Sequence, residues 1–415
     1  MPTLLTLIFT ITLFGLNTGA RALDGPLGFA QTEGGAGGAI IRVTTLAASG
    51  TGSLHAALQT KGPRIVVFEV GGVIDLEKQD LSIREPFVSI AGQTAISPGI
   101  TLIRGGMSIT THDVLIQHIR IRPGDAGEAK RSGWAPDGIT TSGGEAYDII
   151  IDHCSISWAV DENLSASGPR TEGPQATSHR VTFSNCIVAE GLHDSSHPKG
   201  PHSKGSLIHD ACQDIAIIGN LYAHNVRRNP YFKANTTGVI VNNLIYNASG
   251  AAIHLNYVNS EWKNTPLKPR NCRVSIVGNV FVHGEDTVKN LPMISARGDA
   301  YMEDNAAFDQ DGKPARIVAG KIVALAEKPA WPAELEALPA AKTMEHVLQH
   351  AGARPRDRDA VDKRIVHEFR NRTGRVIDSQ EDVGGYPNAA MTTHKLNVPE
   401  SNIGAWLKER AAALE

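Results

Sequence analysis

The chain has 415 residues, of which 20% are charged and 5% aromatic, and its formal net charge at pH 7 is −3. This slightly acidic balance argues against a protein that binds nucleic acid or coats a membrane surface, because both rely on excess positive charge. The length exceeds the usual size of a single core but is compatible with a solenoid, which grows by adding turns.

The N-terminal segment has the features of a secretory signal peptide. The apolar run from Leu4 to Leu16 is too short to span a bilayer, and small residues stand at the two positions that signal peptidase requires for cleavage after Ala22. No Lys or Arg precedes the run, so a membrane anchor is the alternative. Cleavage would remove Arg21 and change the net charge from −3 to −4. We therefore expect a secreted protein, extracellular or periplasmic, without membrane contact once residues 1–22 are removed.

A repeated pattern runs along most of the chain that follows. Short apolar, β-branched runs end at an amide or imidazole side chain, at intervals of 23 to 36 residues. These ends are Gln93, His118, His153, Asn185, Asn220, Asn243, Asn279 and Asn305. Such a period, without helical runs in between, is typical of a parallel β-helix, in which stacked turns bury a common core. We predict this all-β fold for residues 23–325, with a short helix at 52–58 covering the N-terminal end of the core.

The side chains that end each run are interpreted as architecture. Stacked at one corner of successive turns, their amides would hydrogen-bond along the coil and satisfy backbone groups at the bend. His153 is ambiguous, because Asp152 precedes it and a polar loop follows.

The four cysteines are Cys154, Cys186, Cys212 and Cys272. Export would permit disulfides, but Cys154 and Cys186 follow His153 and Asn185 in equivalent positions, where they would stack inside adjacent turns. We therefore expect free, buried thiols. The absence of a CxxC pair excludes a zinc knuckle.

The composition changes in residues 326–415. Lys328–Ala340 is rich in Pro, Ala and Glu and predicts a surface linker. Residues 343–353, 357–371 and 399–414 have the apolar spacing of short helices. We expect this extension to pack along the coil and cover strand edges; a separate binding module is the alternative.

Acidic residues gather on two successive predicted turns. Asp137 and the pair Asp161 and Glu162 flank one predicted strand, so the β-helix would bring them to one face. Clustered carboxylates repel one another unless a cation neutralises them. Oxygen ligands without Cys or a His pair favour Ca²⁺ over a transition metal. The alternative is a set of solvated loop charges with local Arg partners.

Three basic residues, Lys204, Arg228 and Lys233, follow one or two turns later. Single surface charges carry little information, but acidic and basic groups that alternate by turn would form a cleft. Such a cleft suits a polyanion bridged through a metal ion.

Four stretches of the sequence match the motifs of a known family in their order. They are Asp152–Ser157 (DHCSIS) with Asp161 after it, His202–Lys204, Arg228–Lys233 and Val241–Asn243, and residues 375–387 match the tail of one branch of that family. Together they resemble the pectate lyases of polysaccharide lyase family 1, which are secreted, right-handed parallel β-helix enzymes that cleave polygalacturonate. The match covers about residues 85–250.

The resemblance implies a mechanism of β-elimination. Asp137, Asp161 and Glu162 would bind Ca²⁺, and Arg228 would be the base that removes the C-5 proton of a uronate. An arginine has a reference pKa above ~12, so surrounding positive charge would have to favour its neutral form. An alkaline optimum would follow.

The resemblance also implies the partners of the protein. Lys204, Lys233 and His202 would contact the substrate, which is the de-esterified polygalacturonate of plant cell walls. The products would be unsaturated oligogalacturonides. The enzyme would act as a monomer and bind no nucleic acid.

The sequence departs from the family pattern at three positions. Ile139 and Ser165 stand where the family has further acidic residues, and Lys233 replaces an arginine. Other functions on the same fold therefore stay open: a pectin lyase, another uronate lyase or an epimerase, or a polygalacturonase-type hydrolase with Asp161 and Glu162 as its acid pair. A non-catalytic carbohydrate-binding β-helix would explain the repeat but not the ordered cations.

Overall fold

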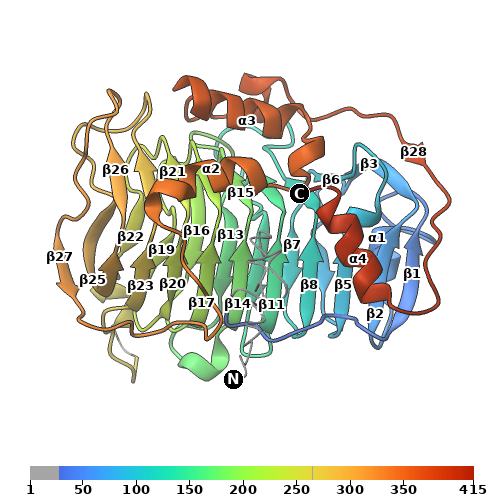
Figure 1. The fold of residues 1–415 in the computed structure, drawn as a ribbon, viewed down its shortest axis with the longest axis horizontal. Helices are drawn as coiled ribbons and strands as arrows, with labels where there is room; N and C mark the ends of the chain where they lie inside the picture. Colours follow the sequence, from blue (N-terminus) through green and yellow to red (C-terminus); the bar gives the residue numbers. More distant parts are fainter. Residues whose placement is uncertain (1–27, 264) are drawn as a thin grey trace, which may run out of the picture.

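The computed structural model describes residues 28–263 and 265–415, and the predicted signal peptide at 1–22 lies outside the described residues. The chain winds as a parallel β-helix, in which the turns contribute short strands to three parallel sheets (Figure 1). For example, β11 (Tyr147–Asp152) pairs in parallel with a strand of the preceding turn and a strand of the following turn. The predicted fold class, an all-β parallel β-helix, is confirmed.

The chain visits the three sheets in a fixed order. The first sheet contains β1 (Ala39–Val43), β2 (Arg64–Phe68), β5 (Val88–Ala91), β8 (Val114–Gln117), β11, β14 (His179–Ser184), β17 (Gln213–Ile218), β20 (Thr237–Val241), β23 (Arg273–Val277), β25 (Ile294–Glu303) and β27 (Lys321–Ala324). The second contains β3 (Val70–Asp75), β6 (Ile100–Ile103), β9 (Ile119–Arg122), β12 (Ser155–Ser157), β15 (Ile187–Ala189), β18 (Leu221–Ala223), β21 (Leu244–Tyr246), β24 (Val280–Val282) and β26 (Ala306–Phe308). The third contains β4 (Leu81–Ile83), β7 (Met107–Ile109), β10 (Ile139–Ser142), β13 (Glu162–Ser167), β16 (Lys204–Ile208), β19 (Tyr231–Phe232), β22 (Ile253–Leu255) and the start of β25.

The interior of the coil is a continuous stack of apolar side chains. On the first sheet Ile116, Ile151, Phe183, Ile217 and Ile240 occupy equivalent positions in successive turns, and each is fully buried. Alternate residues of a strand face opposite sides, so the β-branched runs seen in the sequence present one row of side chains to this core. One turn alone could not bury such a row, and the stack is therefore what stabilises each turn.

An asparagine ladder runs along one corner of the later turns. The Nδ2 groups of Asn220, Asn243 and Asn279 each donate to the Oδ1 of the next member, ending at Asn305, over 3.0 Å in every step. The same Oδ1 atoms accept the backbone N–H of the preceding member, also at 3.0 Å. The ladder thus satisfies backbone groups at the bend, as the sequence predicted.

In the turn before Asn220 the residue at the ladder position is a cysteine. The predicted ladder members of the earlier turns stand one position before the ladder, so their assignment was wrong by one position. The N–H of Cys186 donates to Asn220 Oδ1 over 2.8 Å, which places Cys186 in line with the ladder. The corner residues that precede the ladder position, each with a positive φ between 46° and 59°, are His118, His153 and Asn185. Asn and His tolerate this left-handed conformation, and a corner and a ladder position therefore look alike in the sequence.

All four cysteines are free and buried, which confirms the prediction of reduced thiols. Burial raises the pKa of the Cys186 and Cys212 thiols well above the usual value and that of Cys272 to about 12. A thiol that stays protonated is neither nucleophile nor metal ligand, so these side chains act as small apolar core residues.

Replacing Asn243 with alanine is expected to lower the free energy of unfolding by about 3 kcal/mol, because it leaves buried partners unpaired on both sides. Asn243 Oδ1 accepts from Asn220, and its Nδ2 donates to the carbonyl oxygen of Ile217 over 2.9 Å. Denaturant unfolding followed by circular dichroism measures the change. Asn388→Ala, at an exposed position, is the control, and equal stabilities of the two variants would show that the ladder contributes little.

A short helix covers the N-terminal end of the coil, and two longer helices pack along its side. α1 (Leu54–Leu58) lies where the sequence predicted a capping helix, and it begins at Ser53, whose side chain accepts the Ala56 N–H. In the C-terminal extension, α2 (Ala340–His350) and α3 (Ala360–Asn371) pack their apolar faces on the outside of the second sheet (Figure 1). The remaining short helices are η1 (Gly92–Thr94), η2 (Pro174–Ala176), η3 (Asn259–Trp262), η4 (Pro355–Asp357) and η5 (Gln380–Val383).

The last part of the chain returns to the first turns. β28 (Thr392–Thr393) pairs antiparallel with β3 and so covers the edge of the second sheet. Leu396 and the following α4 (Ile403–Ala412) pack against Ile65 and Val67 of β2 (Figure 1). The extension therefore covers a strand edge, which is the role predicted for it. Within the described residues, every helix is too short or too polar to cross a membrane.

Candidate active site

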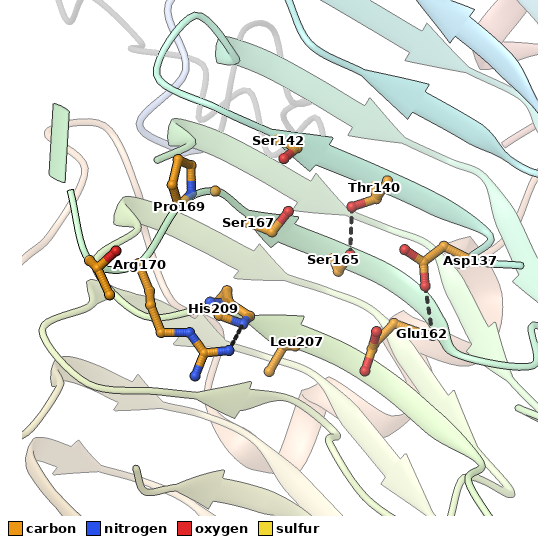
Figure 2. A pocket seen from close by; sticks show the side chains of 12 residues that line it. Asp137, Thr140, Ser142, Glu162, Ser165, Ser167, Pro169, Arg170, Leu207 and His209 are labelled. Atoms are coloured by element: carbon orange, nitrogen blue, oxygen red, sulfur yellow. Dashed lines mark hydrogen bonds between the residues drawn. The ribbon is translucent and has the colours of Figure 1, made fainter. Parts of the chain in front are cut away.

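Parallel pairing in the third sheet brings three carboxylates together. Asp137 lies just before β10, and Asp161 and Glu162 lie at the start of β13, so one oxygen of each falls within 4.8 Å of the others. Asp137 Oδ1 also accepts the backbone N–H of Glu162 over 2.9 Å. Figure 2 shows Asp137 and Glu162 side by side at one end of a groove. This is the convergence that the sequence predicted.

The electrostatics of this cluster favour the binding of a cation. Burial and the nearby carboxylates of Asp161 and Asp80 raise the pKa of Asp137 to about 8, although Arg228 opposes the shift. Arg228 pairs with Glu162, but the carboxylates still repel one another, and a further cation would favour their ionised forms. An all-oxygen donor set is the type that Ca²⁺ prefers, so the residues present fit that ion.

Two histidines, His197 and His202, contact Asp161. Only His202 had been predicted as a site residue from the sequence. Nε2 of His202 lies 3.2 Å from Asp161 Oδ1, and Nε2 of His197 lies 3.5 Å from Oδ2. His197 Nδ1 accepts the backbone N–H of Lys199, so its Nε2 carries the proton and donates to the carboxylate. Burial acts to raise the pKa of Asp161, but the hydrogen bond and charge of His202 and then His197 lower it overall. His202, predicted to bind substrate, therefore contacts the acidic cluster first.

Lys204 stands beside the cluster in the next turn. Its position pairs with Glu162 across the third sheet, and its side chain is largely buried. Burial and the charge of Arg227 lower the pKa of Lys204 to about 8, while Asp161 acts in the opposite direction. The Lys204 ammonium is thus held next to the acidic cluster, in a position to bind a carboxylate of the substrate.

Arg228 faces the acidic cluster from the following turn. Its guanidinium forms an ion pair with the Glu162 carboxylate, and it lies 5.8 Å from the centre of the Tyr231 ring. Burial lowers the pKa of Arg228 below its usual value, although the neighbouring carboxylates, Asp161 first, act to raise it. The backbone at Arg228 has a φ of 67°, a strained conformation for a bulky side chain and one often found at functional sites.

A second group of buried amides fixes the loops that carry these residues. Asn163 Nδ2 donates to Asn225 Oδ1 over 3.2 Å, and Asn225 Nδ2 donates to Asn229 Oδ1 over 3.1 Å. Asn163 follows the acidic pair and Asn229 follows Arg228, so the three amides tie the acidic loop to the basic one. This group of amides was not predicted, because its members share no repeat position in the sequence.

Lys233 is placed differently from the prediction of a substrate-binding residue. Its Nζ is buried and lies 2.8 Å from Asp210 Oδ2 and 2.6 Å from Glu261 Oε2. Glu261 also pairs with Arg170 over 2.6 Å. A lysine already held by two carboxylates would have to break these contacts to bind a substrate. In this arrangement Arg170, which is partly exposed, is the more accessible cation.

The groove beside the acidic cluster is about 550 Å³ in volume and is lined mainly by polar groups. Its floor consists of hydroxyl side chains from β10 and β13, and Arg170 and His209 lie at its far side (Figure 2). The hydroxyl residues are Thr140, Ser142, Ser165 and Ser167. Hydroxyl groups and charges without aromatic walls suit a ligand rich in hydroxyl and carboxylate groups.

Comparison with known proteins places the chain in a family. No protein-family model matches it. A curated relative named probable pectate lyase C, from Aspergillus flavus, is 31% identical over 394 residues, which are 92% of this chain and 85% of that protein. Two solved structures share the fold. One is jun a 1, the major allergen from cedar pollen, with a TM-score of 0.57 and 16% identity over 78% of this chain and 92% of that chain. The other is a pectate lyase bound to a hexasaccharide, with a TM-score of 0.53 and 14% identity over 79% of this chain and 96% of that chain.

The two kinds of comparison support different statements. Identities of 16% and 14% show the fold alone. The fungal relative shows more, because 31% identity extends over nearly the whole of both chains. The chain belongs to the pectate lyase family and is a polysaccharide lyase.

Proposed function

We propose that this pectate lyase cleaves de-esterified polygalacturonate by calcium-assisted β-elimination and releases unsaturated oligogalacturonides. The observation that carries the proposal is the convergence of Asp137, Asp161 and Glu162 directly beside Lys204 and Arg228. A hexasaccharide is the ligand of one solved pectate lyase of this fold, which supports a chain-like substrate. The apolar run at 4–16 supports secretion, outside the cell or into the periplasm.

Asp137, Asp161 and Glu162 would hold the calcium ion. When bound, the ion supplies positive charge that neutralises the substrate carboxylate and the negative charge that develops as the C-5 proton leaves. His197 and His202 keep Asp161 oriented through their Nε2–H groups. Lys204 provides a further cation for the uronate carboxylate, which stabilises the enolate-like charge of the transition state.

Arg228 would be the base in this mechanism. Its burial already lowers the pKa. When Glu162 binds the cation, that carboxylate neutralises Arg228 less, and the positive charge nearby favours the neutral guanidine. The neutral form accepts the C-5 proton, the electron pair of that C–H bond forms the C-4 to C-5 double bond, and the C-4–O bond breaks; the leaving oxygen takes up a proton from solvent. Because a neutral guanidine is scarce at neutral pH, activity is expected to increase toward alkaline pH.

The test is ultraviolet absorbance of the conjugated double bond, measured on polygalacturonate with Ca²⁺ and then with a chelator. An increase that the chelator abolishes supports the proposal. Reducing ends without absorbance would identify a hydrolase. Calcium-independent activity on methyl-esterified pectin would identify a pectin lyase, and the absence of any turnover would contradict the proposal.

Lys204→Ala is expected to reduce kcat/KM on polygalacturonate by about 100-fold, because it removes a buried cation from the charge that develops in the reaction. The pKa of about 8 adds a pH dependence: the ammonium is present below this pH and is lost above it, so KM should increase as the pH passes about 8. Lys204→Arg should retain binding and lose that increase, since arginine stays charged. The exposed Lys199→Ala is the control, and a wild-type KM profile in Lys204→Arg would exclude this role.

A further inference from the structure

A second cluster of metal-ligating side chains lies at the corner between the first and second sheets, away from the acidic groove of the third. The corner residues His118 and His153 stack with ring centres 5.3 Å apart. Glu415, which follows α4, reaches both of them: its Oε1 lies 3.6 Å from His118 Nε2 and 3.7 Å from His153 Nδ1. One ligand atom of each residue falls within 4.8 Å of the others.

The key observation is a buried nitrogen without a partner. His118 is fully buried, and its Nδ1 lies 2.8 Å from the carbonyl oxygen of Ala353. A carbonyl oxygen only accepts, so Nδ1 carries the proton and Nε2 presents a lone pair. That Nε2 has no hydrogen-bond partner, and the nearest charged atom is a carboxylate oxygen, which also presents lone pairs. The His118 nitrogen is buried while the Glu415 carboxylate is partly exposed, and two acceptors that face each other in this way are stabilised by a cation or a proton between them.

The distance between the two facing atoms fits an intervening metal ion. At 3.6 Å, His118 Nε2 and Glu415 Oε1 are too far apart for a hydrogen bond. This distance matches the separation of about 3.3–3.6 Å between two ligand atoms of a tetrahedral zinc ion, which follows from bonds of about 2.0–2.2 Å.

The surroundings of the two rings are those of oriented metal ligands. His118 Nδ1 donates to the Ala353 carbonyl, and His153 Nδ1 donates to Asp152 Oδ2 over 2.9 Å, which leaves Nε2 of each ring as the ligand atom. Asp152 is held in turn by the side chains of Gln117, Ser184 and Asn185 over 2.8–3.0 Å. Carbonyl and carboxylate partners of this kind fix the tautomer and orientation of ligating histidines.

We propose that His118, His153 and Glu415 bind one divalent transition-metal ion, with zinc as the preferred ion. Imidazole and carboxylate ligands favour zinc and its neighbours, whereas the all-oxygen cluster of the groove favours calcium. Three protein ligands are found among the described residues, which leaves a fourth position for water. Two further histidines, His346 and His350 of α2, have rings 4.7 Å apart. Zinc at this site fastens the end of the extension to two turns of the coil.

The test uses full-length protein that is first stripped of metal ions and then saturated with Ca²⁺. Zinc binding to this protein is measured by titration calorimetry, and Co²⁺ serves as a spectroscopic probe of the same site. We expect one tight site per chain, and visible absorption of Co²⁺ typical of four-coordinate nitrogen and oxygen ligands. His118→Ala should abolish the site, and Glu415→Gln should weaken it at least about 10-fold. Glu415→Gln alters a partly exposed side chain and tests the site even if His118→Ala does not fold. Zinc should increase the Tm of the wild type and not that of Glu415→Gln.

Asp161→Asn is the matched control, because Asp161, His197 and His202 are the other described group that contains histidine ligands. In that group His197 Nε2 carries a proton, as its Nδ1 accepts from Lys199, so we expect weak zinc binding there. Asp161→Asn should therefore leave the tight site unchanged. Loss of the site in Asp161→Asn, or unchanged zinc affinity in both Glu415→Gln and His118→Ala, would overturn the proposal.

Discussion

Replacing Arg228 with lysine is expected to reduce kcat on polygalacturonate by about 1,000-fold, which is within the range for loss of a general base. Lysine keeps the positive charge that pairs with Glu162, so the acidic cluster and the fold should be retained. Its amine, however, neither reaches the same position nor spreads the charge over a planar group. Steady-state kinetics from the ultraviolet absorbance of the product measure the change.

Arg227→Lys is the control for this experiment, because it makes the same exchange one position earlier and outside the ion pair with Glu162. It should retain most of the activity. Circular dichroism and Tm should be the same for the two variants. If Arg228→Lys remained within about 10-fold of the wild type, Arg228 would be a substrate-binding cation and the base would have to be another group.

Removing calcium is expected to make the stability of the protein depend steeply on pH. The folded-state pKa of Asp137, about 8, is raised above its usual value of 3.8. Below about pH 4 the carboxyl is protonated in both states and its favourable contribution is fully present. As the pH increases from about 4 to the folded pKa of about 8, this contribution is lost at up to about 1.4 kcal/mol per pH unit, because the unfolded state has released its proton and the folded state has not. In chelator, Tm should therefore decrease between about pH 5 and pH 8.

Asp137→Asn separates this effect from other titrations. Asparagine keeps the oxygen that accepts the Glu162 N–H but cannot ionise, so the Tm of the variant in chelator should vary less with pH. Calcium should increase the Tm of the wild type at pH 8 and not that of the variant, and lyase activity should decrease at least about 100-fold. Equal responses to calcium in the two proteins would exclude Asp137 as a ligand.

Much of the fold could be predicted from the sequence, because its repeating unit is local. Apolar runs that end in Asn define the stacked core and the ladder of Asn220, Asn243 and Asn279, and these interactions depend only on the period. The corner residues His118 and His153 were assigned one position wrongly, since both a ladder and a left-handed corner select small polar or imidazole side chains.

The candidate site was predictable in part. Turn positions predicted that Asp137, Asp161 and Glu162 converge, the resemblance supplied Arg228 as the base, and the structure brings these residues together. The partners of Lys233 were not predictable, because Asp210 and Glu261 lie on other turns and nothing in their local sequence marks them as its partners. Where a charged side chain points depends on such distant neighbours, and a single sequence does not contain that information.

The pairing of β28 with β3 closes an otherwise open-ended solenoid. In a simple repeat the strands of each turn are fully paired once the next turn has formed, so the chain could fold turn by turn during synthesis. Here the first turns lack their edge strand and part of their outer cover until residues 392–407 are present. A C-terminal deletion would therefore expose the N-terminal end of the coil. The first expected effect is association of truncated molecules with one another through the unpaired edge of β3.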